Sequence, residues 1–164
     1  MKSLEKGTKF IALGGTIAAL YVVLSLIATA LGISSGVIQV RFSEALCILP
    51  CFTTAAIPGV TIGCFITNLI SGGAALDLIF GTLATLIGAV GTYFLRKNRW
   101  VAAVPPIVSN VLIIPWVLRV AYEMPDSYPY MMLTVFIGEF ISIGFLGELL
   151  YTAAGKTKIF SKIS

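Results

Sequence analysis

The residues of this chain that could do chemistry are a few polar and ionisable side chains set within long apolar stretches. They are Arg41, Glu44, Asn68, Asp77, Asn110, Arg119 and Glu139. Such side chains are costly at membrane depth, and they usually face a bundle interior or a cavity. Glu139 stands out, because we expect it about two and a half turns inside a helix, where a carboxylate needs a partner, a proton or a ligand. Interface residues and a structural pair of Arg41 with Glu44 are the plainer interpretation.

Several familiar chemistries lack their residues in this sequence. The chain has no histidine, and its three cysteines, Cys47, Cys51 and Cys64, lie in apolar stretches. Small buried thiols are expected there rather than a metal or redox site. No phosphate-binding glycine loop, nucleophile elbow or metal-ligand spacing is present. We therefore expect no catalytic residue, no metal and no cofactor, and any ATP hydrolysis would come from partner subunits.

The composition indicates an integral membrane protein. Apolar residues make up 58% and charged residues 11% of the 164 residues, against roughly 45–50% and about 25% in soluble domains, and the mean hydropathy is +1.01. The 11 basic and 7 acidic side chains cannot coat a small globule with polar surface. This composition excludes a soluble enzyme, a disordered chain and a disulfide-rich secreted module.

The cations gather in three patches, at the start, in the middle and at the end of the chain. The patches are Lys2, Lys6 and Lys9; Arg96, Lys97 and Arg99; and Lys156, Lys158 and Lys162. A protein that binds nucleic acid would spread its cations over one face, so no nucleic-acid partner is expected. Patches between apolar stretches are typical of membrane edges.

We predict an all-α integral membrane protein of one domain, 1–164, with six transmembrane helices and both termini cytoplasmic. The helices are expected at about 10–31, 40–57, 58–72, 77–95, 100–121 and 130–153. The uncharged run 45–76 decides the topology, because only two crossings there put all three basic patches on one side, as the positive-inside rule prefers. Pro50 and Pro58 supply breaks. The second and third helices are therefore expected to be short or kinked, with Gly36 as an alternative start of the second.

This topology places most of the polar candidates toward the outer half of the membrane. The inner half has little beyond Glu148. The pattern predicts a polar pocket that is open to the outside and closed below. Aromatic residues near this layer, such as Trp116 and Tyr122, could stack on a planar ligand or belong to the interfacial aromatic belt.

Small residues recur at the four-residue spacing that lets helices pack closely. Gly59 with Gly63, and Ala84 with Gly88, are expected to make contacts within the bundle. The first helix carries Gly14 with Ala18 and Gly15 with Ala19. For that helix, contact with another subunit competes with contact inside the chain.

The run RFSEALCILPCFTTAAIPGVTIGCFITNLI and the later segments LDLIFGTLATLIGA, PPIVSN and IGE closely resemble the QueT family. The resemblance covers about residues 8–155. It implies a substrate-binding S component of an energy-coupling factor (ECF) transporter, in the cell membrane of a bacterium. It also implies docking on a transmembrane coupling subunit and two ATPase subunits through small residues of the first helix. These are Ala12, Gly14, Gly15, Ala18 and Ala19.

The ligand that the resemblance implies is a queuosine precursor, a deazaguanine such as the aminomethyl form or queuine. Its guanine-like edge offers N–H donors to a carboxylate, its carbonyl needs a donor, and its cationic amine suits a second carboxylate. Our hypothesis is that Glu139 or Asp77 binds the guanine edge and that Glu44 pairs with Arg41 to close the pocket.

Other functions stay open at this point. An S component for another vitamin or purine-like ligand would have the same sequence features. A solitary carrier or channel would need ion-coupling groups or an inverted repeat, and we find neither. A membrane-embedded enzyme is disfavoured by the absence of histidine and of a cluster of metal-binding carboxylates.

Overall fold

The computed structural model describes residues 2–34 and 38–156, and within them every regular element is a helix. Six helical segments follow one another along the chain. They are α1 (Lys2–Ala30); the 3₁₀ helix η1 (Phe42–Cys51); α2 (Ala56–Ile70); α3 (Ala75–Phe94); α4 (Arg99–Ala102) with α5 (Val104–Ala121); and α6 (Tyr128–Glu139), the π-helix η2 (Phe140–Gly147) and α7 (Glu148–Lys156). The expected start near Gly36, and the terminal Lys158 and Lys162, lie outside the described residues.

Four helices in the described part of the chain are long and apolar enough to cross a membrane. They span Lys6–Ala30, Ala75–Phe94, Arg99–Ala121 and Tyr128–Lys156. The segments η1 and α2 have 10 and 15 residues, or about 20 Å and about 23 Å, which is less than the hydrocarbon core of about 30 Å. The predicted helical membrane class is therefore found with a short second and third segment. Four of the six predicted transmembrane helices are thus long enough to cross a membrane.

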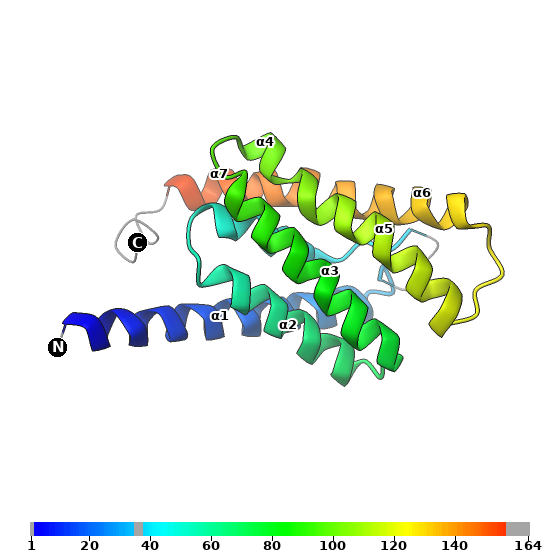
Figure 1. Ribbon diagram of the computed structural model, residues 1–164, viewed down its shortest axis with the longest axis horizontal. Coiled ribbons are helices and arrows are strands. Elements are labelled where there is room, and N and C mark those ends of the chain that lie inside the picture. The colour runs from blue at the N-terminus through cyan, green and yellow to red at the C-terminus, as the bar shows by residue number, and fades with distance from the viewer. Residues whose placement is uncertain (1, 35–37, 157–164) are drawn as a thin grey trace.

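The segments run back and forth along a long bundle (Figure 1). The start of α1, the turn between α3 and α4, and the end of α7 lie at one end, and the links after α1, α2 and α5 lie at the other. Lys6, Lys9, Arg96, Lys97 and Lys156 are thus carried by elements of the first end. We call it the basic end; that it faces the cytoplasm is a prediction from the positive-inside rule.

The 3₁₀ helix η1 forms the centre of the bundle. Eight of its ten residues are buried, and Leu46, Cys47 and Leu49 pack in the same cluster as Tyr21 of α1 and Val60 of α2. Pro50 lies near the end of η1, where a residue without an N–H group limits further helical hydrogen bonding. The second segment therefore ends earlier than the expected 57, and the chain turns at 52–55 into α2.

Glycines let α1 and α2 approach closely. A Cβ atom on Gly63 would lie 2.6 Å from Cβ of Tyr21, and one on Gly59 would lie 2.9 Å from the carbonyl oxygen of Gly14. The same holds between α3 and α5, where a Cβ atom on Gly88 would lie 2.6 Å from Cα of Pro106. These contacts fit the predicted packing of small residues inside the bundle, because helices in lipid associate by close van der Waals contact.

Replacement of Gly63 by alanine is expected to destabilise the contact between α1 and α2. The new methyl group has no room beside Tyr21, so overpacking should lower the free energy of unfolding by about 1–3 kcal/mol, seen as a lower melting temperature in detergent. Gly15→Ala is the matched control, because a Cβ atom at Gly15 meets nothing within 4 Å. An equal loss of stability in both variants would contradict this packing.

Candidate functional site

A polar cavity of about 340 Å³ lies at the end of the bundle opposite the basic end. It is surrounded by α1 and the link that follows it, by the end of α2, the link to α3 and the start of α3, and by the end of α5 with the link after it. Its lining residues are Tyr21, Ser25, Thr29, Ser34, Gln39, Arg41, Thr67, Asn68, Ser71, Gly72, Gly73, Asp77, Leu118, Tyr122 and Met124. The volume falls at the lower end of the range for small-molecule sites, about 300–1,000 Å³.

The seven predicted site residues divide into three groups. Arg41, Asn68 and Asp77 line the cavity. Glu44, Asn110 and Glu139 are buried in the bundle outside the lining. Arg119 is exposed, and its guanidinium donates a hydrogen bond to the carbonyl oxygen of Asp126 at 3.1 Å.

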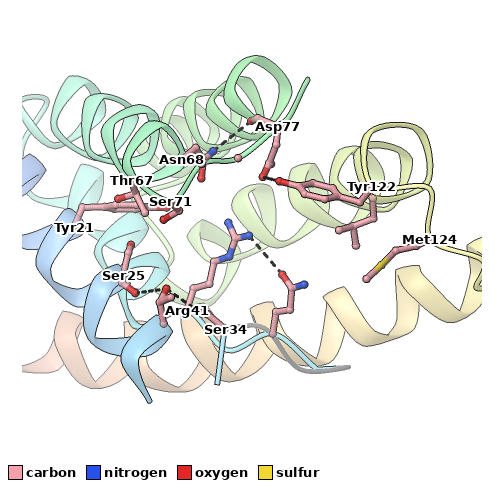
Figure 2. Close-up of a pocket in the computed structure, with 15 residues that line it drawn as sticks. Tyr21, Ser25, Ser34, Arg41, Thr67, Asn68, Ser71, Asp77, Tyr122 and Met124 are labelled. Carbon is pink, nitrogen blue, oxygen red and sulfur yellow. Dashed lines mark hydrogen bonds between the residues drawn. The ribbon is translucent and has the colours of Figure 1, made fainter. Parts of the chain in front are cut away.

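Arg41 reaches into the cavity from the segment just before η1 (Figure 2). Its backbone N–H donates to Oγ of Ser142 at 3.1 Å, and its guanidinium donates to Oε1 of Gln39 at 3.5 Å. A Cβ atom on Gly138 would collide with the carbonyl oxygen of Gln39. The segment that carries Arg41 therefore lies directly against the junction of α6 and η2.

The expected ion pair between Arg41 and Glu44 is wrong. The carboxylate of Glu44 accepts hydrogen bonds from the hydroxyl group of Tyr21 and, at 3.2 Å, from the thiol group of Cys47. Among the described residues no ion pair joins it to Arg41. The prediction assumed that both residues lie on one helix, but Arg41 is extended, with φ −114° and ψ 108°, and lies before η1.

Glu139 lies deep in the bundle, at the end of α6. The residue is 8% exposed, and its Oε2 atom is buried without a hydrogen-bond partner. Arg41, Glu44 and Asn110 are near enough to interact with it electrostatically or by hydrogen bonding. Two buried carboxylates and one guanidinium thus form a cluster beside the cavity.

Tyr122 connects the end of α5 to the link between α2 and α3 (Figure 2). Its hydroxyl group donates to Oδ2 of Asp77 at 3.0 Å and accepts from the N–H of Ala74 at 3.2 Å. Asn68 donates to the carbonyl oxygen of Asp77 at 3.3 Å. Burial raises the pKa of the Tyr122 hydroxyl, and the neighbouring Asp77 carboxylate raises it further. The hydroxyl therefore stays protonated at neutral pH and holds one rim of the cavity together.

The sequence analysis missed the polar stripe of α1. Tyr21, Ser25 and Thr29 follow at four-residue intervals and all line the cavity. Ser25 also donates to Oγ of Ser43 in η1 at 2.7 Å. Their helical spacing in an apolar segment is a signal that could have identified them, whereas nothing comparable marks Leu118 or Met124.

The small residues of α1 lie on two different faces. Ala12, Gly15 and Ala19 are exposed. Gly14 and Ala18 face α2, because their carbonyl oxygens lie 2.9 Å and 3.0 Å from where Cβ atoms on Gly59 and Gly63 would be. The free face of α1 is therefore the one marked by Ala12, Gly15 and Ala19.

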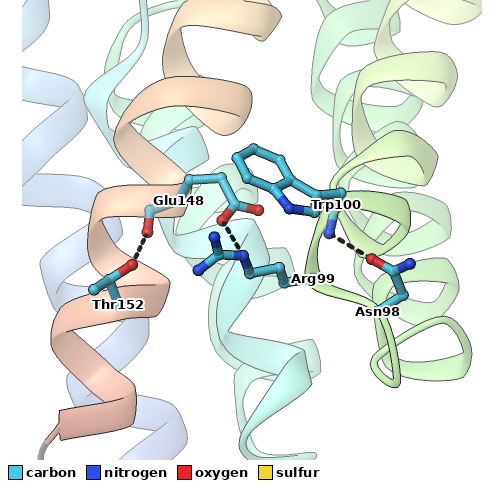
Figure 3. Close-up of polar contacts among 5 residues, drawn as sticks. All are labelled: Asn98, Arg99, Trp100, Glu148 and Thr152. Carbon is cyan, nitrogen blue, oxygen red and sulfur yellow. Dashed lines mark hydrogen bonds and ion pairs between the residues drawn. The ribbon is translucent and has the colours of Figure 1, made fainter.

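Another buried carboxylate, that of Glu148, lies toward the basic end (Figure 3). Glu148, the first residue of α7, forms an ion pair with Arg99 at 3.4 Å. The guanidinium of Arg99 lies 4.8 Å from the centre of the Trp100 ring. This carboxylate has a cation of its own within the chain, so a structural role accounts for it.

These features define an α-helical membrane protein with a polar, ligand-sized cavity at one end. The family model of the QueT transporter matches residues 11–156. The chain belongs to the QueT transporter family, which confirms the resemblance found in the sequence.

A curated relative carries the name queuosine precursor transporter QueT and comes from Lactococcus lactis subsp. cremoris. It is 44% identical to this chain over 71 residues, which are 43% of this chain and 41% of the relative. The alignment therefore spans less than half of that protein. No solved structure matches the chain.

Tyr122→Phe is expected to loosen the rim of the cavity. The variant loses both the donor to Asp77 and the acceptor for the Ala74 amide, so the free energy of local opening should fall by about 0.5–1.5 kcal/mol. Hydrogen–deuterium exchange of the link 71–74 should speed up. Tyr130→Phe, at an exposed tyrosine of α6, is the control, and unchanged exchange in Tyr122→Phe would refute the connection.

Proposed function

We propose that this chain is the substrate-capture (S) subunit of an ECF-type importer and that its cavity binds a queuosine precursor, a deazaguanine. Membership of the QueT transporter family supports a transport function, and the relative's name supports the ligand class. The observation that carries the proposal is the cavity itself, where Asp77, Asn68 and Arg41 combine a carboxylate, an amide and a guanidinium.

These three groups suit two parts of a deazaguanine. The carboxylate of Asp77 can accept two N–H bonds from the guanine-like edge. The carbonyl oxygen of the ring needs a donor, which Arg41 or Asn68 supplies. The ring of Tyr122 offers an aromatic surface at the rim of the cavity. Asp77 is the better of the two hypothesised carboxylates for the guanine edge, because it lines the cavity and Glu139 does not.

The proposal also assigns an orientation and partners. With the basic end in the cytoplasm, the cavity opens to the outside of a bacterial cell membrane. The ligand is then delivered inward when the chain docks on a transmembrane coupling subunit with two ATPase subunits. Ala12, Gly15 and Ala19 form the proposed docking face, because they are the exposed small residues of α1.

Ligand titration tests the proposed substrate. Aminomethyl-deazaguanine or queuine is expected to quench or enhance the fluorescence of Trp116, which packs against Phe80 with ring centroids 5.0 Å apart. Asp77→Asn should weaken binding by about tenfold or more, because it removes a charge-assisted contact. Asp126→Asn, an exposed acid in the link before α6, should leave binding unchanged. Binding of riboflavin or biotin instead of a deazaguanine would keep the class of transporter and overturn the substrate.

Co-purification tests the proposed docking face. Gly15→Leu adds a bulky side chain where nothing lies within 4 Å, so the chain should fold and bind ligand but lose the coupling and ATPase subunits. Gly155→Leu is the matched control, because a Cβ atom at Gly155 of α7 also meets nothing within 4 Å. Retention of the partner subunits by Gly15→Leu would show that this face is not the docking surface.

A further inference from the structure

The two ends of the bundle carry opposite charge. Among residues 2–34 and 38–156, five of the seven acidic and two of the nine basic residues line the cavity, lie near Arg41, or belong to the end of α5 and the link after it, and we call this region the cavity half. They are Glu44, Asp77, Glu123, Asp126 and Glu139, against Arg41 and Arg119. Two positive and five negative groups give this half a formal net charge of −3. A negative field in a low-dielectric surrounding concentrates cations.

Glu139 is the acid of this half whose buried charge is not balanced locally. Its Oε2 atom has no hydrogen-bond partner. Its carboxylate interacts with Asn110 and with one guanidinium, Arg41, which also interacts electrostatically with Glu44 and Asp77. Glu148 lies in the same long helical segment and is equally buried, but Arg99 pairs with it. A buried carboxylate that shares its one nearby cation with other acids is unfavourable unless a proton or a second cation neutralises it.

Glu139 lies next to residues that contact one wall of the cavity. Glu139 is not part of the cavity lining, but its neighbour Gly138 packs against the backbone of Gln39, and Ser142 accepts the N–H of Arg41. Both Gln39 and Arg41 line the cavity. Glu139 therefore lies directly behind the part of the cavity wall that Gln39 and Arg41 form.

We infer that the natural ligand carries a primary ammonium group on a short arm and that Glu139, supported by Glu44, is the subsite that binds this ammonium while the ring stays in the cavity. This inference rests on the proposed function and adds to it a choice among deazaguanines. The guanine-like edge and the aminomethyl arm lie on opposite sides of the ring. In the proposed pose the ring meets Asp77 at the rim and directs the aminomethyl arm toward Glu139 in the interior.

Two ligands with the same ring separate this subsite from the rest of the cavity. Aminomethyl-deazaguanine is a cation, and cyano-deazaguanine is neutral and of similar length. The purified full-length protein in detergent is expected to bind the amine about tenfold or more tightly than the nitrile, because a charged hydrogen bond is lost with the nitrile. Glu139→Gln should weaken the amine by about the same factor and leave the nitrile unchanged.

The matched control is Glu123→Gln, which removes one charge from the same half of the bundle at an exposed position. It should keep the preference for the amine, since salt screens exposed charges. Glu139→Asp keeps the charge but withdraws it by one methylene, so it should lower the affinity for the amine alone. If Glu139→Gln does not fold, the Glu139→Asp variant and the preference of the wild type for the amine together test the subsite.

The outcomes separate the two proposals. Equal affinity of the wild type for amine and nitrile, or equal weakening of both ligands in the Glu139 variants, overturns the ammonium subsite and leaves the proposed function standing. If Asp77→Asn loses the preference for the amine over the nitrile and the Glu139 variants keep it, the ammonium binds at the rim. That result would also overturn the subsite at Glu139. If neither deazaguanine binds, the proposed function fails, and the subsite fails with it.

Discussion

The hydrogen bond from Tyr21 to Glu44 joins the two elements on which the cavity depends. It is buried and connects α1 to η1. Tyr21 is also the side chain against which Gly63 of α2 packs. Three segments are therefore fixed in register around one phenol ring. With η1 held there, the residue before it, Arg41, is directed into the cavity, and a shift of η1 would move the guanidinium with it.

Close packing explains why α1 has two different faces. Helices in lipid gain little from burying apolar surface against one another, so they need small residues to approach. Gly14 and Ala18 serve this need against α2, while Gly15 and Ala19, one position further, remain exposed. One run of small residues thus supports the fold on one face and leaves a smooth second face.

The sequence predicted the helical membrane class and three lining residues, because polar side chains in apolar segments are conspicuous. It could not predict the extended conformation of Arg41, since a rule for spacing on one helix says nothing of where that helix begins. For this reason the expected Arg41–Glu44 pair was wrong. Hydroxyl groups such as Ser25 were missed because they also satisfy themselves within a helix. The rim contact of Tyr122 with Asp77 joins residues far apart in sequence, and no local pattern indicates such a contact.

The π-helix η2 explains how one helical segment buries two carboxylates. Glu139 precedes its eight residues and Glu148 follows them. In an uninterrupted α-helix this separation would put the two side chains on opposite faces, and one of them would meet lipid. The wider turns of a π-helix change the rotation between its ends, and both residues are in fact buried. The π-helix therefore lets both acids lie in the bundle interior. At one end of η2, the ion pair with Arg99 explains why Glu148 is buried. At the other end no ion pair among the described residues involves Glu139, so the burial of this carboxylate needs another explanation, which the proposed ammonium subsite supplies.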